Sequence, residues 1–134
     1  MLIIVQVMPA ILAQKMPVTN DKPEYCTPED FWRISKVDAH CHINTERPAF
    51  MEEALKDNFS IVTINTDAYG SLSVDEQQRL AVAQKKMFPD RLAFLATFPM
   101  KGWEEADWQE ETVARIADAF SKGAIGIKVW KNIG

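Results

Sequence analysis

The two histidines of the chain, His40 and His42, lie two positions apart in the segment Val37–Ile43. The segment has the length and composition of a short buried strand, in which alternate side chains share one face. We therefore expect Asp38 to lie on the same face as both imidazoles, and Cys41 on the other. Two adjacent imidazoles can bind a divalent metal ion, with zinc as the first candidate at Zn–N distances of about 2.0–2.1 Å. The pattern predicts a metal-dependent enzyme in which both histidines are ligands.

A lysine in the last predicted strand is the second candidate for chemistry. Lys128 alternates with Ile127 and Val129, so its side chain is expected on the face opposite to theirs. A lysine inside a parallel sheet is costly unless it has a charged partner or reaches the rim. We expect Lys128 to be catalytic; the alternative is a structural ion pair with a carboxylate such as Asp38.

Polar residues also end the second predicted strand. Asn65 and Asp67 follow its apolar run, at a strand-to-helix loop of the kind that often carries binding residues. We expect both side chains to contact a small-molecule substrate. The alternative is that they serve only to cap the following helix.

These residues need a scaffold, and the sequence predicts alternating strands and helices. A capping box begins a helix at Ser73, and Pro89 and Gly123 end two helices. The longest helix should bury an apolar stripe made of Val113, Ile116, Ala117 and Phe120. The expected strands cover 36–43, 60–66, 91–98 and 124–130, and the expected helices cover 28–34, 49–58, 73–88 and 105–122.

Strands that begin 24 to 33 residues apart, with helices between them, pair in parallel through right-handed crossovers. The predicted class is therefore α/β. Four such strands form either a small open sheet or the first half of a (β/α)8 barrel, which needs about 250 residues. Because Gly134 follows the last strand with no covering helix, we expect residues 36–134 to be the N-terminal half of a barrel from a longer protein.

The N-terminal segments differ in kind from the rest. Residues 2–13 are apolar except for Gln6, which suits a signal peptide over residues 1–13 although no basic residue precedes the run. The alternative is a buried N-terminal strand. Residues 14–35 should form a polar extension with a short helix that begins after Thr27. We therefore expect a secreted or periplasmic protein, with a cytoplasmic location as the alternative.

The composition limits the kinds of partner that this chain is expected to bind. The 134 residues carry a formal net charge of −4, without a basic stripe, which argues against nucleic acid. The apolar run near the N-terminus is too short to span a bilayer stably. Two cysteines do not make a disulfide framework, and Cys41 is expected to pack as a small apolar side chain. The expected partners are therefore a small-molecule substrate and, in a possible homo-oligomer, further copies of the chain.

The stretch Val-Asp-Ala-His-Cys-His-Ile at 37–43 resembles the first-strand Asp-x-His-x-His signature of the amidohydrolase superfamily, in particular its amidohydrolase-related branch. The resemblance extends from about Asp30 to the end of the chain through the order and spacing of the strands. It implies that His40 and His42 match the family's first-strand metal ligands and that Asp38 supports them by hydrogen bonding. Lys128 falls where some members use a fourth-strand lysine to bridge metals or to hold a substrate carboxylate.

The resemblance also implies that further ligands, usually a histidine and an aspartate, come from the fifth and eighth strands. The expected function is a metal-dependent hydrolase of C–N, ester or lactone bonds that uses a metal-activated water. One alternative is a metal-dependent non-oxidative decarboxylase, and another is a non-catalytic secreted half-barrel. For the 134-residue chain alone we expect weak metal binding, no turnover and aggregation through the uncovered fourth strand.

Overall fold

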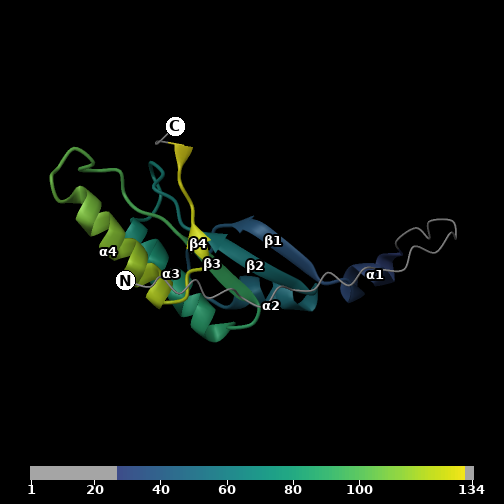
Figure 1. Cartoon of the computed structure of the whole chain (residues 1–134). Coiled ribbons are helices and arrows are strands. Elements are labelled where there is room, and N and C mark those ends of the chain that lie inside the picture. The colour runs from purple at the N-terminus through teal and green to yellow at the C-terminus, as the bar shows by residue number, and fades with distance from the viewer. Residues whose placement is uncertain (1–26, 132–134) are drawn as a thin grey trace, which may run out of the picture.

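The computed structural model describes residues 27–131. Four parallel strands form one sheet in the order β1-β2-β3-β4, with helices between them, as Figure 1 shows. This confirms the predicted α/β class with parallel strands, and the arrangement is compatible with half of a barrel. The strands are β1 (Lys36–Cys41), β2 (Phe59–Ile64), β3 (Leu92–Ala96) and β4 (Gly126–Ile127), and the helices are α1 (Pro28–Arg33), α2 (Ala49–Lys56), α3 (Val74–Met87) and α4 (Trp108–Ser121).

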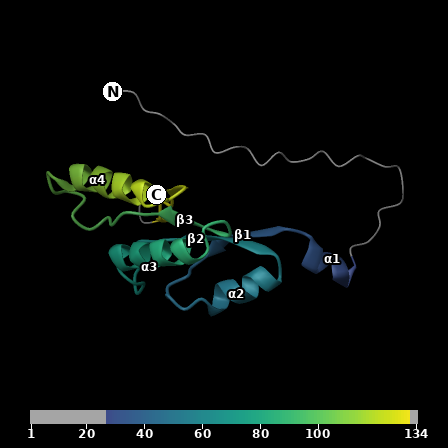
Figure 2. The same cartoon turned by 90° about the horizontal axis from the view of Figure 1, so that it is seen from below.

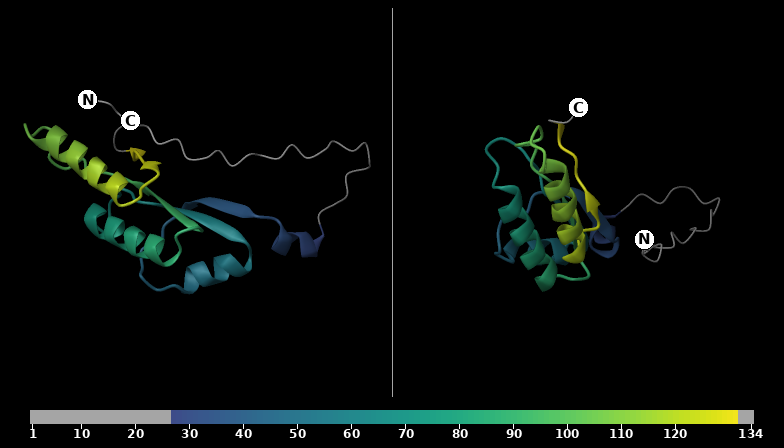
Figure 3. Two further views of the ribbon diagram at one scale, coloured as in Figure 1. Left: turned by 60° about the horizontal axis from the view of Figure 1, so that its bottom comes forward. Right: turned by 60° about the vertical axis from the view of Figure 1, so that its left-hand side comes forward.

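The core lies between one face of the sheet and helices α2, α3 and α4. Ile61 of β2 and Leu92 of β3 pack with Met51 of α2 in one buried cluster. Phe94 of β3 packs with Ala81 and Ala119, from α3 and α4, in a second cluster. Figure 2 shows α2 and α3 on the same side of the sheet, and Figure 3 shows α3 and α4 side by side. The opposite face of the sheet has no helix against it among residues 27–131.

Local sequence signals explain where the helices begin. The backbone N–H of Thr27 donates to the Asp30 carboxylate at 2.8 Å, and Pro28 occupies the first turn of α1. The hydroxyl of Ser73 accepts from the Glu76 backbone N–H at 3.2 Å, as predicted for α3. The strands are shorter than predicted, most of all β4, in which only Gly126 and Ile127 pair with β3.

The predicted apolar stripe of α4 is wrong in most of its members. Val113 is 61% exposed and Phe120 is 46% exposed, and Ala117 is exposed as well. Ala119 is instead fully buried, because α4 contacts the sheet near its C-terminal end, where Ala119 meets Phe94. The periodicity predicted the helix correctly, but it did not indicate which face of α4 packs against the sheet.

The described residues test only part of the N-terminal and membrane predictions. Over residues 27–131, no helix is both long and apolar enough to cross a membrane. The signal peptide predicted for residues 1–13, and most of the extension predicted for residues 14–35, lie outside the described residues. The helix predicted within the extension is α1, which stands apart from the other helices beyond the start of β1 (Figure 1).

Candidate functional site

A bulge in β1 changes which side chains share a face with the histidines. Asp38 pairs with Ile61, but Cys41 pairs with Thr63, so three steps along β1 oppose two steps along β2. Neighbours across a ladder project to the same side, which places Asp38 and Cys41 together on the helix-covered side. The expectation that Asp38 shares a face with His42 is therefore wrong. Simple alternation fails here because the strand carries one extra residue.

Asp38 nevertheless contacts the histidine segment through the backbone. Its carboxylate accepts a hydrogen bond from the backbone N–H of His40 at 2.9 Å, across the bulge. This bond fixes the chain direction at the point where β1 departs from regular pairing. Asp38 is thus placed to orient the end of the strand, and its contact is with the main chain of a histidine.

The two imidazoles lie beside each other at the C-terminal end of β1. Their ring centroids are 5.5 Å apart with an interplanar angle of 71°, and both side chains are exposed. The Nδ1 atom of His42 lies 2.9 Å from the carbonyl oxygen of Ile64. A carbonyl only accepts, so Nδ1 carries a proton, and in the neutral ring Nε2 is then the nitrogen with the free lone pair.

The separation of the two ring centroids, 5.5 Å, is close to the value expected for two ligands of one metal ion. With Zn–N distances of about 2.0–2.1 Å and a tetrahedral angle, two ligating rings have their centres roughly 5 Å apart. A backbone carbonyl that fixes the tautomer of a ligating histidine is a common supporting contact at metal sites. Among residues 27–131, no group of three or more His, Cys, Asp or Glu side chains could hold a metal. The described part of the chain therefore brings no third side chain of these types to the histidine pair.

Cys41 lies between the two histidines but is not placed to join them. Its side chain is half-buried and packs against the cluster of Ile43, Met51, Ile61 and Leu92. Burial raises the pKa of the Cys41 thiol, and the nearby Asp38 carboxylate raises it further. Because the thiolate is the form that binds metals, this environment disfavours Cys41 as a ligand.

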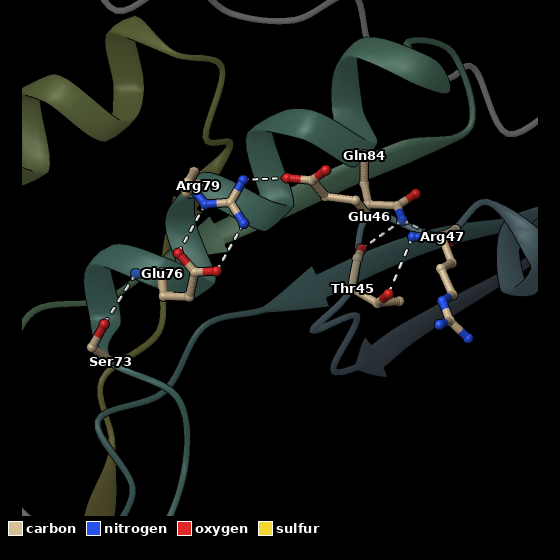
Figure 4. Close-up of polar contacts among 7 residues, drawn as sticks. All are labelled: Thr45, Glu46, Arg47, Ser73, Glu76, Arg79 and Gln84. Carbon is tan, nitrogen blue, oxygen red and sulfur yellow. Dashed lines mark hydrogen bonds and ion pairs between the residues drawn. The ribbon is translucent and has the colours of Figure 1, made fainter.

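The loop that follows the histidines is anchored to β2 and α3. The backbone N–H of Ile43 donates to the Thr63 hydroxyl at 2.9 Å. The side-chain amide of Gln84, which is fully buried, donates to the carbonyl oxygens of Thr45 at 2.7 Å and Arg47 at 3.0 Å. Figure 4 shows Gln84 of α3 pointing at this loop.

These anchoring residues were not predicted from the sequence, although a signal was present. Gln77 and Gln84 lie seven positions apart in α3 and share a face with the buried Ala81. Polar side chains that recur on the buried face of a helix need partners, since an unsatisfied buried amide is costly. Two glutamines at this spacing therefore predict side chains that hold nearby backbone.

Lys128 lies just beyond β4 and continues its alternation. Ile127 pairs with Ala96, which faces the helices, so Lys128 is expected on the helix-free side with the imidazoles. Its backbone N–H donates to Ala96 O at 2.7 Å, and its carbonyl accepts from Thr97 Oγ1 at 2.8 Å. β1 and β4 are the two edges of the sheet, three strand spacings or roughly 14 Å apart. Lys128 and the histidines thus share a face but not a contact, and none of the ion pairs within residues 27–131 includes Lys128.

Asn65 and Asp67 both follow β2 but do not lie together with the imidazoles. Asn65 is buried, and alternation from Ile61 and Thr63 puts it on the helix-covered side. Asp67 accepts a hydrogen bond from the Met100 backbone N–H at 2.9 Å, which ties the loop after β2 to the loop after β3. Asp67 also lines a shallow surface pocket with Ala68, Tyr69, Trp130 and Lys131. Substrate contact by either residue stays a prediction.

Comparison with known proteins adds no assignment. No protein-family model matches the chain, and neither the curated proteins nor the solved structures contain a match.

Proposed function

We propose that the chain provides two metal ligands, His40 and His42, to a zinc-dependent hydrolase of the amidohydrolase type that acts on amide, ester or lactone bonds. The observation that supports this most strongly is the pair of exposed imidazoles 5.5 Å apart at the carboxyl end of a parallel strand. Active sites of barrel enzymes lie at that end of the strands. The four-stranded sheet would form the first half of such a barrel.

Each residue has a distinct role in the proposed site. His42 would bind the metal through Nε2 while its Nδ1–H donates to the Ile64 carbonyl. Asp38 would keep His40 in place through the backbone hydrogen bond across the bulge. The chemistry that zinc would supply there is a water with its pKa lowered to about 7 and polarisation of a substrate carbonyl. Lys128, on the helix-free face of the sheet, would bind a negatively charged group of the substrate at a distance from the metal.

The described residues do not complete the site. Two imidazoles hold a zinc ion less tightly than the three protein ligands usual in catalytic zinc sites. We therefore expect residues 1–134 alone to bind zinc weakly and to show no turnover. In a protein that supplies the remaining ligands, we expect zinc-dependent hydrolysis of lactones, esters or amides, and the decarboxylation of aromatic acids instead would contradict the hydrolase assignment.

Metal binding by the histidines can be tested with cobalt(II), whose absorption spectrum reports nitrogen ligands. We expect a saturable visible band for the unaltered chain and its loss in the double variant His40→Asn/His42→Asn, which leaves no imidazole in the protein. Cys41→Ala is the matched control, because it removes a neighbouring thiol and should keep the band. A cobalt band that persists in the double variant would contradict the proposal.

Export is proposed on separate grounds. We infer from the apolar run at residues 2–13 that residues 1–13 act as a signal peptide and that the protein reaches the periplasm or the exterior. N-terminal sequencing of the mature protein from an expressing bacterium should begin near Gln14. A product that retains Met1 and stays in the cytoplasm would contradict this inference.

A further inference from the structure

We propose that Gln84 is a positioning residue for the metal-binding pair, acting from α3 through the loop that follows β1. The inference depends on the proposed function, because it gives Gln84 a role in metal affinity in addition to its role in stability. Gln84 does not contact either imidazole. It holds the backbone that leads away from them.

The contacts of Gln84 are long-range and specific. Its side chain is fully buried in α3, yet its amide reaches backbone 37 and 39 residues earlier in the chain. One nitrogen, Nε2, donates to both Thr45 O at 2.7 Å and Arg47 O at 3.0 Å (Figure 4). These two bonds fix a turn that the Arg47 backbone N–H also closes on the Thr45 hydroxyl at 3.1 Å.

Very little chain separates this turn from the metal ligands. Ile43 is buried, and its N–H is bound by Thr63, so only Asn44 lies between that anchor and Thr45. His42 immediately precedes Ile43. A change in the path of the turn therefore reaches the His42 backbone over two or three residues. Outer groups that orient ligands typically change metal affinity by about 10- to 100-fold when they are removed.

A second contact from α3 to the loop is weaker. Arg79 binds Glu76 on its own helix and also pairs with Glu46 in the loop (Figure 4). About half of the Arg79 and Glu46 side chains is exposed, so water and salt screen this pair. We therefore assign the positioning role to the buried Gln84.

The chain offers a matched control in the same helix. Gln77 is also buried, and its side chain makes three hydrogen bonds, with Thr66 N at 2.9 Å, Thr66 O at 2.8 Å and Leu72 O at 2.6 Å. These bonds hold the loop after β2, which carries no histidine. Gln77→Met and Gln84→Met thus remove the same kind of side chain, at similar burial, from two different loops.

The experiment compares these two variants in the whole chain. The first readout is the NMR signals of the two imidazoles without metal, which are unambiguous because the chain has only two histidines. The second readout is the zinc dissociation constant.

We expect Gln84→Met to move the imidazole signals and to weaken zinc binding about tenfold or more. We expect Gln77→Met to leave both readouts nearly unchanged, although both variants lower stability. If either methionine variant fails to fold, Gln84→Asn and Gln77→Asn give the same comparison with a shortened amide.

The outcomes separate this inference from the proposed function. Equal effects of the two variants on the imidazoles would overturn the positioning role and leave Gln84 as a structural residue. An unaltered chain that binds no zinc would contradict the proposed function, and the metal-free imidazole signals would still decide whether Gln84 positions them. Unmoved signals in Gln84→Met would overturn the inference whatever the zinc result.

Discussion

The centre and the edges of the sheet differ in how they are held. In β2 and β3, Ile61, Leu92 and Phe94 are at most 2% exposed and pack against three helices. In the edge strand β1, Val37 is 63% exposed, and beside β4 Val129 is 53% exposed. The candidate metal ligands lie at an edge of the sheet, His40 in β1 and His42 directly after it. The comparison indicates that the centre supplies most of the stability, while the site depends on individual hydrogen bonds to neighbouring elements.

The largest expected effect comes from opening the centre. Phe94 is fully buried between β3 and the helices α3 and α4, so Phe94→Ala would remove a ring and leave a cavity. We expect a loss of about 3–5 kcal/mol in the free energy of unfolding, measured by urea denaturation. The edge control, Val37→Ala, should change that free energy by no more than about 0.5 kcal/mol. Similar losses in both variants would remove the distinction between centre and edge.

A smaller effect on the free energy of unfolding is expected at the contact between the central strand β2 and the segment that follows the edge strand β1. Thr63 of β2 accepts the N–H of Ile43 at 2.9 Å, and both residues are buried. Thr63→Val keeps the shape but leaves that N–H without its partner, at a cost of about 1–3 kcal/mol. Hydrogen exchange should show a selective loss of protection at the Ile43 amide. Unchanged protection there would show that β1 does not need this tether.

The edges should govern self-association more than stability. Val129 lies beside the free edge of the sheet at β4, and exposed apolar edges promote pairing between chains. We expect Val129→Lys to reduce concentration-dependent light scattering with little change in the unfolding free energy. Val37→Lys provides the comparison at the β1 edge, where we expect a smaller reduction. Scattering that does not respond to Val129→Lys would contradict aggregation through β4.

The smallest effect concerns a surface ion pair on α4. The hydrogen bond from Lys122, 2.6 Å long, lowers the pKa of the Asp118 carboxyl below its ordinary 3.8. A lowered pKa means that this contribution to stability is present above about pH 4 and is lost as pH falls through the folded-state value. The difference in the free energy of unfolding between the unaltered chain and Asp118→Asn should therefore become smaller below pH 4, as measured by denaturation at a series of acidic pH values. A difference that widens on acidification would contradict this ion pair.

Much of the scaffold could be predicted because its signals are local. The Ser73 cap, the helix stop at Pro89 and the apolar runs of the strands each act within a few residues. The parallel order followed from strands that alternate with helices. The stripe on α4 could not be assigned correctly, because the burial of Ala119 depends on where β3 meets the helix.

The site was only partly predictable for a similar reason. The histidine pair is a local motif, and its rings lie together as the spacing suggested. The bulge in β1 arises from pairing with β2, so a period of two placed Asp38 on the wrong face. The spacing of Gln77 and Gln84 indicates that both side chains need partners, but no local pattern identifies the carbonyl oxygens 37 and 39 residues away that Gln84 contacts.

The most direct test of the central proposal is the coordination of zinc by the purified chain. X-ray absorption at the zinc edge counts imidazole ligands and distinguishes nitrogen at about 2.0–2.1 Å from sulfur at about 2.3 Å. The proposal predicts two imidazoles per zinc, with oxygen ligands completing the sphere and no sulfur. A zinc ion bound by cysteine sulfur, or by fewer than two imidazoles, would contradict it.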